Sequence, residues 1–403
     1  MYARTPRCSE ILCIICRFYC ALCSAGAGTR TPLQAVRARA QPLRPIIARM
    51  RSAFLVCAGG LVLAPALAAQ DTPALAPGDP APAFAIAHWV QGEPVAAFEA
   101  GKIYVLDFWA TWRAPCKDSV PRLSELQAEY AGKLTIIGVT DEKPEAVARF
   151  LGATELQGKA VYTLACDPDR SIHGAYLTPA GQTTLPVSFA IGADGKLQWI
   201  GHPLNLHKVL PDLVAGTWDA AAARTGFELE RQLTLLNRKL AGARPEERQA
   251  LFEQAASLME QLAQTNPKVY GQYLVEKFKL TAVALGRLKE AYAQAEPMLK
   301  TLWDDADALN EFAWFIVDPE GALPDSDRDL DLAMKAAARA CELSRNEDGN
   351  ILDTLARVHY LKGDLKKAVE LQEKAVEHAV GANVEAIRKA LEAYRKELAA
   401  AQA

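Results

Sequence analysis

The ten residues Asp107–Cys116, with the sequence DFWATWRAPC, are the most informative stretch of this chain. They continue a strand-like apolar run and end on a cysteine that stands three residues after Arg113. Thiol-disulfide exchange normally uses two cysteines at CxxC spacing across the first turn of a helix, one to attack and one to resolve the mixed disulfide. Arg113 occupies the first of these positions, so only the second thiol, Cys116, remains.

The N-terminal part of the sequence predicts an export signal that starts inside the chain. Residues 1–49 hold eight arginines, one acid and five cysteines, whereas Met50 opens a stretch of different character. One arginine, a short apolar run and a small-residue cleavage site follow Met50, as in a signal peptide. The apolar run is too short to span a bilayer comfortably, and no stable membrane span is expected. We therefore expect residues 1–49 to be a misassigned or non-coding leader and residues 50–69 to be a signal peptide, with the bacterial periplasm as the destination.

The mature chain, taken to begin at Gln70, is acidic. Nine arginines and one acid precede Gln70, and removing them from 45 basic and 48 acidic residues leaves a net charge of about −11. This balance argues against nucleic-acid binding. Three cysteines remain, Cys116, Cys166 and Cys341, an odd number that provides no even disulfide framework.

No metal or other cofactor is expected. The leader cysteines come in CxxC pairs, but apolar residues separate them and no frame follows that would hold a tetrahedral site. These cysteines are Cys13, Cys16, Cys20 and Cys23. His202 has no second ligand at suitable spacing.

Residues 71–218 alternate between apolar, β-branched runs and helical patterns, which indicates a βαβ sheet with helices on its faces. The strand-like runs are Ile103–Trp109, Leu134–Val139, Ala160–Leu164, Val187–Ile191 and Lys196–Ile200. Asp194 and Gly195 predict a hairpin turn between the last two runs. A closing helix is expected over Leu206–Ala215.

Residues 220–403 have a helical period throughout and no strand pattern. Leu285–Ala291 recurs 77 residues later as Lys362–Ala368, with Gly, Leu, Lys and Ala in register. This spacing equals two 34-residue units plus a loop, which resembles tetratricopeptide repeats, most clearly in residues 270–380. An irregular helical bundle is the alternative, and either one would present a surface rather than a catalytic site.

Residues 80–218 resemble the thioredoxin superfamily, and within it the exported TlpA/ResA-type thiol-disulfide oxidoreductases. The matching residues are Asp107, Trp109, Trp112, Pro115, Cys116, Lys117, Pro121 and Leu185-Pro186. The resemblance implies that Asp107 is a buried carboxylate, that Pro121 lies inside the active-site helix and that Pro186 is the cis-proline of a peptide-binding groove. The expected fold is thus an α/β thioredoxin fold followed by an all-α helical-repeat domain.

The substitution at Arg113 changes the expected chemistry. An attacking thiol belongs at a helix N-terminus, where the dipole and free N–H groups stabilise its thiolate. Arginine has no nucleophile, and its fixed cation at the positive helix end costs about 0.3–1 kcal/mol unless an acid compensates. Its guanidinium would instead suit a carboxylate of a partner.

Cys116 and Asp107 each have two interpretations. Cys116 is either a buried, quiet thiol or a monothiol whose pKa is lowered by Arg113 and the helix end. Asp107 either relays a proton to or from Cys116, as the resemblance implies, or is a buried acid with a solvent partner.

Several other residues have structural expectations. A substitute disulfide between Cys116 and Cys166 is disfavoured, because the resemblance places the two cysteines too far apart, and Cys341 is expected to pack in the helical core. Asp167, Asp169 and His173 resemble a helix-capping loop rather than a metal site. A peroxidase of the peroxiredoxin kind would need PxxxTxxC spacing, and Trp109 stands where its proline should be.

Two functions remain open. In the first, the protein is a TlpA-type family member that acts through Cys116, with Asp107, as a monothiol on a thiol or disulfide partner. In the second, it is a non-catalytic binding module whose groove holds extended acidic segments, while the helical repeats hold another protein. The expected groove residues are Trp109, Trp112, Arg113, Pro115 and Pro186.

Overall fold

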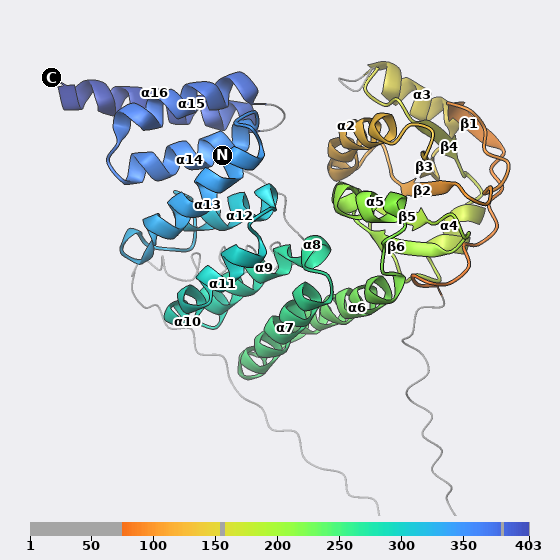
Figure 1. The fold of residues 1–403 in the computed structure, drawn as a ribbon, viewed down its shortest axis with the longest axis horizontal. Helices are drawn as coiled ribbons and strands as arrows, with labels where there is room; N and C mark the ends of the chain where they lie inside the picture. The colour runs from red at the N-terminus through yellow and green to blue at the C-terminus, as the bar shows by residue number, and fades with distance from the viewer. Residues whose placement is uncertain (1–74, 154–157, 380–382, 403) are drawn as a thin grey trace, which may run out of the picture. The chain divides into compact units, whose positions relative to one another are not determined.

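The structure is a computed structural model that describes residues 75–153, 158–379 and 383–402 (Figure 1). The expected leader, residues 1–49, and the expected signal peptide, residues 50–69, lie outside the described residues. Among the residues that are described, no helix is both long enough and apolar enough to cross a membrane.

Six strands form one mixed sheet in the spatial order β1-β4-β3-β2-β5-β6. The strands are β1 (His88–Gln91), β2 (Ile103–Phe108), β3 (Leu134–Thr140), β4 (Thr163–Cys166), β5 (Val187–Ile191) and β6 (Leu197–Gly201). β2 pairs in parallel with β3 and antiparallel with β5, and β3 pairs in parallel with β4. β1 and β6 are antiparallel edge strands. This is the mixed, thioredoxin-like sheet that the resemblance implies.

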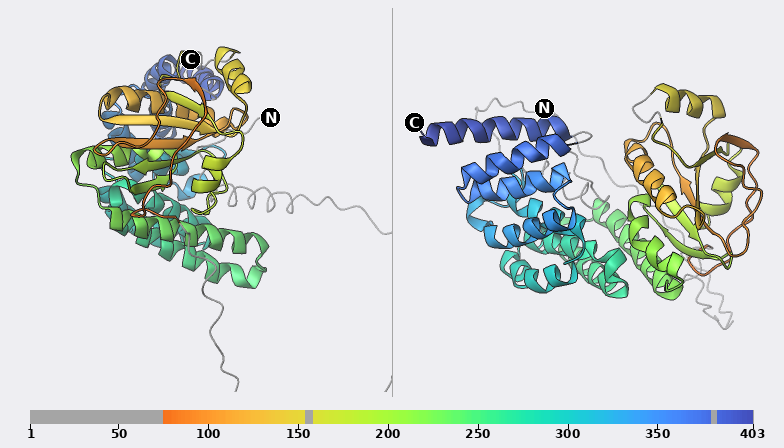
Figure 2. Two further views of the ribbon diagram at one scale, coloured as in Figure 1. Left: turned by 90° about the vertical axis from the view of Figure 1, so that its right-hand side faces the viewer. Right: turned by 45° about the horizontal axis from the view of Figure 1, so that its top comes forward.

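Four α-helices accompany the sheet, and Figure 2 shows the strands with helices around them. They are α2 (Ala114–Glu129), α3 (Pro144–Ala153), α4 (Ser171–Tyr176) and α5 (Leu206–Ala215), with the short 3-10 helix η1 (Pro203–Asn205) before α5. Pro115 lies in the first turn of α2, where its missing N–H costs nothing, and Pro121 lies inside the same helix. The expected position of Pro121 inside the active-site helix is confirmed.

Alternation along β2 sends its side chains into two cores, because successive residues of a strand point to opposite faces. Val105 and Trp109 pack with Cys116 on the α2 face of the sheet. Leu106 and Phe108 pack on the opposite face, with residues of α4. Asp107 alternates with Val105 and Trp109, and its carboxyl therefore lies on the same face as α2.

Most of these strands and helices were predicted from the sequence. The Val187–Ile191 strand and the Leu206–Ala215 helix are confirmed to the residue, and Gly195 takes the expected turn conformation with φ of 73°. The strand expected over Ala160–Leu164 instead runs over Thr163–Cys166. Strand β1 was not expected, since its four residues are only partly buried and do not alternate in polarity.

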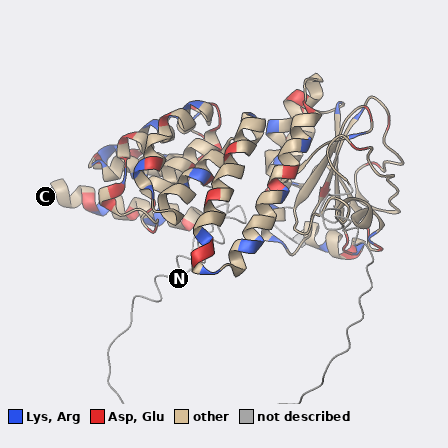
Figure 3. Cartoon of the chain, turned by 90° about the horizontal axis from the view of Figure 1, so that it is seen from below, with Lys and Arg blue, Asp and Glu red and all other residues tan. Residues whose placement is uncertain are grey.

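The rest of the described chain is helical. The helices are α6 (Ala220–Gly242), α7 (Pro245–Thr265), α8 (Pro267–Tyr270), α9 (Gln272–Lys279), α10 (Leu288–Ala293), α11 (Ala295–Thr301), α12 (Ala306–Val317), α13 (Leu330–Leu343), α14 (Gly349–Leu361), α15 (Leu365–His378) and α16 (Val384–Gln402), together with the π-helix η2 (Leu280–Ala284) and the 3-10 helix η3 (Asp325–Asp327). Residues of both charges are interspersed along these helices in Figure 3. The expected all-α region after the α/β fold is confirmed.

Aspartates begin four successive helices, α12 to α15. Each carboxylate accepts hydrogen bonds from free backbone N–H groups of the first turn, which replaces bonds that the helix cannot make itself. The capping residues are Asp305, Asp329, Asp348 and Asp364. Capping therefore fixes where each of these helices starts.

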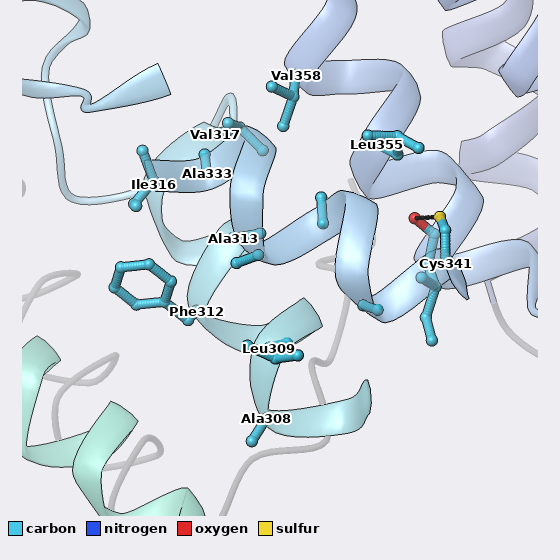
Figure 4. Close-up of a cluster of buried hydrophobic side chains, with 14 of the residues drawn as sticks. Ala308, Leu309, Phe312, Ala313, Ile316, Val317, Ala333, Cys341, Leu355 and Val358 are labelled. Carbon is cyan, nitrogen blue, oxygen red and sulfur yellow. Dashed lines mark hydrogen bonds between the residues drawn. The ribbon is translucent and has the colours of Figure 1, made fainter. Parts of the chain in front are cut away.

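Small residues on one face of α13 let it pack closely in the helical core (Figure 4). Cys341 is 2% exposed, and its Sγ lies 3.7 Å from the carbonyl oxygen of Ile351 in α14. Its expected role in core packing is confirmed. The neighbouring alanines of α13 are fully buried: Ala333, Ala336, Ala337 and Ala340.

The two copies of the repeated heptapeptide both contain a glycine in the left-handed region. Gly286 has φ of 65° before α10, and Gly363 has φ of 82° before α15. A glycine accepts this conformation without the steric cost that other residues have. The tetratricopeptide-like period itself remains a prediction.

Candidate functional site

Asp107 lies near the end of β2, between Gly138 of β3 and Ser188 of β5. The Ser188 hydroxyl donates a hydrogen bond of 2.7 Å to Oδ1 of Asp107. Asp107 is 1% exposed, and the hydrogen-bond partner of its Oδ1 lies on the neighbouring strand β5. Burial raises the pKa of Asp107 to about 7, while the Ser188 hydrogen bond acts in the opposite direction.

Cys116 lies in the first turn of α2 and is 0% exposed. Burial raises its pKa to about 11, and the charges of Asp107 and Glu142 act in the same direction. A backbone hydrogen bond from Ala110 and the charge of Arg113 lower the pKa by less. The thiol form of Cys116 therefore strongly predominates at neutral pH. The thiolate is the nucleophile, so this site is a poor one for unassisted attack.

Arg113 is the residue before the first turn of α2, with an extended backbone at φ of −97° and ψ of 119°. No acid lies in the first turn of this helix, and Arg113 makes no ion pair with any residue that the structure describes. Its Cζ lies 5.7 Å from the ring centroid of Trp112, which is a cation–π distance. Trp112 is 69% exposed. Together the exposed indole of Trp112 and the half-buried guanidinium of Arg113 form an aromatic and cationic surface beside the buried thiol.

The other expected groove residues differ in exposure. Pro115 is exposed at the start of α2, and Pro186 is buried directly before β5. The peptide bond between Leu185 and Pro186 is cis, as the resemblance implies. Trp109 is 1% exposed and packs near Phe150, with 6.0 Å between ring centroids. It therefore supports the site from the core and does not contribute to its surface.

Glu142 anchors the loop before α2, a role that the sequence analysis missed. Its Oε2 accepts a hydrogen bond of 2.7 Å from the backbone N–H of Thr111, and its Oε1 accepts one of 2.7 Å from the Thr111 hydroxyl. The Thr140 hydroxyl, at the end of β3, donates to Oε2 as well, at 3.2 Å. The two bonds to Thr111 connect residues 31 positions apart, so no local pattern in the sequence predicts them.

Asp167 and His173 form the expected capping loop and, in addition, a buried pair. Asp167 accepts hydrogen bonds from the backbone N–H of His173 and from the Ser171 hydroxyl, at 2.8 and 3.0 Å, and Asp169 accepts one from the Ser171 N–H. The His173 ring Nδ1 lies 2.7 Å from the Asp167 carboxylate, and both side chains are buried. The His173 ring contacts Phe108 on the sheet face opposite Cys116. The pair therefore does not belong to the Cys116 site.

The three cysteines that the structure describes are all free and buried, so the disfavoured disulfide between Cys116 and Cys166 does not form. Cys166 ends β4, and burial raises its pKa to about 11. In the described ranges, no group of three or more His, Cys, Asp or Glu side chains is placed to hold a metal ion.

Residues 77–200 match the model of the AhpC/TSA family. The protein FixW of Rhizobium leguminosarum is 25% identical over 151 residues, which cover 36% of this chain and 68% of that protein. The thiol-disulfide oxidoreductase ResA of Bacillus thuringiensis is 36% identical over 99 residues, 24% of this chain. The chain spans about half of ResA, 53%. A thiol:disulfide interchange protein of Chlorobium tepidum, a solved structure, is 24% identical with a TM-score of 0.28, over 34% of this chain and 96% of that chain.

The matched segment contains every strand of the sheet apart from the final residue of β6, together with Asp107, Arg113, Cys116 and the cis-proline. Residues 77–200 are therefore similar to the AhpC/TSA family, and they form the thioredoxin-like α/β part of the described chain, which an all-helical region follows.

Proposed function

We propose that this protein uses its thioredoxin-like site to bind a protein partner without two-thiol turnover. Trp112 and Arg113 contact an extended, acidic segment of the partner, and the segment lies along the groove beside Pro186. The single observation that carries the proposal is a contrast at the start of α2. Arg113, which is half-buried and makes no ion pair with any described residue, stands where the attacking thiol would be, whereas Cys116 is fully buried.

The charge of the site favours an anionic ligand. The positive end of the α2 dipole and the Arg113 guanidinium have the same sign, and the first turn of α2 supplies no acid to neutralise them. A guanidinium can hold a carboxylate through two parallel hydrogen bonds. The ring of Trp112 adds an apolar contact of large area, as aromatic anchors in interfaces do.

The compartment and a second partner are also part of the proposal. A signal peptide over residues 50–69 would send the protein out of the cytoplasm, where protein thiols and disulfides are natural ligands for such a domain. The helical region, residues 220–403, would then hold a second protein through its repeats. ResA is named as a thiol-disulfide oxidoreductase, which is consistent with partners that carry thiols or disulfides.

Peptide binding tests the proposal directly. The mature chain, residues 70–403, is titrated against a fluorescent peptide of alternating glutamate and apolar residues, and against the same peptide with lysine in place of glutamate. Arg113→Ala is expected to weaken binding of the acidic peptide about tenfold, the loss of one charge-assisted hydrogen-bonded pair. Cys116→Ser is expected to leave binding unchanged.

Arg122→Ala is the matched control, because Arg122 lies on the same helix and pairs with Glu125 at 2.8 Å. It removes the same charge from α2 without touching the proposed contact. If Arg113→Ala and Arg122→Ala weakened binding of the acidic peptide equally, the effect would be one of net charge, and a specific site at Arg113 would be rejected. Preference for the lysine peptide would reject it as well.

Monothiol chemistry at Cys116 is the second candidate. The backbone hydrogen bond from Ala110 and the charge of Arg113 both lower the pKa of Cys116, against the larger effect of burial and the charge of Asp107, which raise it. This function predicts that iodoacetamide modifies Cys116 much faster than Cys341 at neutral pH. Equally slow modification of both, measured by mass spectrometry of peptides, would rule it out.

A further inference from the structure

A row of small residues crosses the sheet beside Asp107. In the strand register, Gly138 is its neighbour on β3 and Ser188 is its neighbour on β5. A Cβ atom at Gly138 would stand 3.1 Å from Nε1 of Trp109, 3.1 Å from Cε2 of Tyr162 and 2.7 Å from a methyl carbon of Leu164. The missing side chain of Gly138 thus allows Trp109 and Tyr162 to approach the sheet next to the carboxyl.

Three fully buried polar atoms on residues around Gly138 have no hydrogen-bond partner in the described chain: Oδ2 of Asp107, Nε1 of Trp109 and Oη of Tyr162. Their side chains are 1%, 1% and 3% exposed. Buried polar groups are rarely left unpaired, because each one loses its hydration without replacement. Three such atoms on one face of the sheet, around one glycine, therefore require a common explanation.

The three atoms are complementary in hydrogen bonding. Trp109 offers an N–H donor, Tyr162 offers an O–H donor, and the second oxygen of Asp107 is an acceptor. We propose that Asp107, Trp109 and Tyr162 bind one buried water molecule, which accepts from the indole and the phenol and donates to the carboxylate. A buried water typically makes about three hydrogen bonds to groups of this kind.

This arrangement makes Tyr162 a positioning residue for the ionisation of Asp107. Burial raises the pKa of Tyr162 well above its usual value, and the charges of Asp107 and Cys116 add to this effect, so the phenol keeps its proton as a donor. Hydrogen bonds to an ionised carboxylate lower its pKa. Asp107 acts electrostatically on Cys116, whose other charged neighbours are Arg113 and Glu142.

The inference does not depend on the proposed peptide binding, because its readout is the Asp107 carboxyl itself. The mature chain is labelled with carboxyl-13C aspartate, and the Asp107 signal is identified by its loss in Asp107→Asn. Tyr162→Phe keeps the ring and removes the hydroxyl. It is expected to raise the titration midpoint of Asp107 by about one pH unit. This is the effect of losing one hydrogen bond in the series that runs from Tyr162 through the water to the charged carboxylate.

Tyr176→Phe is the matched control. Tyr176 is also buried, but it lies in the core on the other face of the sheet, and its hydroxyl donates to the carbonyl of Pro82 at 2.8 Å. It is expected to leave the Asp107 midpoint unchanged. An unmoved or lowered midpoint in Tyr162→Phe, or an equal rise in both variants, would overturn the proposal.

A high-resolution crystal structure of the unsubstituted chain provides a second measurement that needs no variant to fold. Density for a water within hydrogen-bonding distance of Asp107 Oδ2 and of both donors supports the proposal. The absence of such density, or a direct hydrogen bond between Tyr162 and Asp107, overturns the water site.

Discussion

Replacing Asp107 by asparagine is expected to stabilise the protein, and to do so increasingly as the pH rises. The pKa of Asp107 is about 7 in the folded chain, against 3.8 for an unperturbed aspartate. The unfolded chain therefore loses this proton at a lower pH than the folded chain does, and ionisation favours unfolding. Asparagine keeps the acceptor oxygen for the 2.7 Å hydrogen bond from Ser188 but never ionises.

The size of the effect follows from the two pKa values. Below about pH 3 the carboxyl is protonated in both states and contributes no penalty. Between the two pKa values the penalty grows by about 1.4 kcal/mol for each pH unit, to about 2 kcal/mol at pH 5 and about 4 kcal/mol above pH 7.5. Asp107 is fully buried, so solvent screening does not reduce this figure. The gain of Asp107→Asn should follow the same curve.

Urea unfolding of the mature chain at pH 4, 5, 6, 7 and 8.5, followed by tryptophan fluorescence, measures this curve. The quantity of interest is the difference in free energy of unfolding between the wild type and Asp107→Asn, which cancels the titration of all other groups. Asp118→Asn, an exposed change on α2, serves as the control and should show little difference at any pH. A difference that stays constant from pH 4 to 8.5 would refute the assignment of a raised pKa to Asp107.

Three further changes test other parts of the site. Arg113→Cys restores a CxxC motif and is expected to give insulin-reducing activity in the presence of dithiothreitol, well above that of the wild type; no gain would mean that more than the first thiol has been lost. Glu142→Gln should weaken the two hydrogen bonds to Thr111 and lower the free energy of unfolding by about 1–3 kcal/mol. It should also speed hydrogen exchange at the Thr111 amide, and unchanged exchange would contradict the anchoring role of Glu142. Gly138→Ala should lower the free energy of unfolding by about 1–3 kcal/mol, because its Cβ would meet three side-chain atoms. Gly152→Ala in α3 is the control, because its Cβ meets nothing within 4 Å, and it should be neutral or stabilising. Equal effects of the two changes in thermal unfolding would refute the packing argument.

The parts of the site that lie in one continuous motif were predictable from the sequence. DFWATWRAPC fixes the end of β2, the loop and the first turn of α2, so the places of Asp107, Arg113 and Cys116 follow from chain connectivity. The proline before β5 could be placed only through the family resemblance, since its position opposite the motif depends on strand pairing. The structure has this proline cis and β2 paired with β5.

The parts that depend on contacts between distant residues were not predictable in this way. Glu142 reaches Thr111 across 31 positions, and Tyr162 joins the Asp107 neighbourhood only because β4 pairs in parallel with β3. The start of β4 was placed three residues too early, since Ala160 and Tyr162 are buried and apolar but precede the ladder. The protonation state of Cys116 was not predictable either, because it depends on burial, and the spacing of a motif does not show how much protein covers a thiol.

The burial of the three cysteines has a practical consequence for anyone who handles this protein. Cys116, Cys166 and Cys341 are between 0% and 2% exposed, and no two of them are joined by a disulfide. Crosslinking between molecules needs two sulfurs to meet at a surface, and the described chain offers none there. A protein of residues 70–403 should therefore keep its thiols during purification in air, without added reductant, and migrate identically on reducing and non-reducing gels.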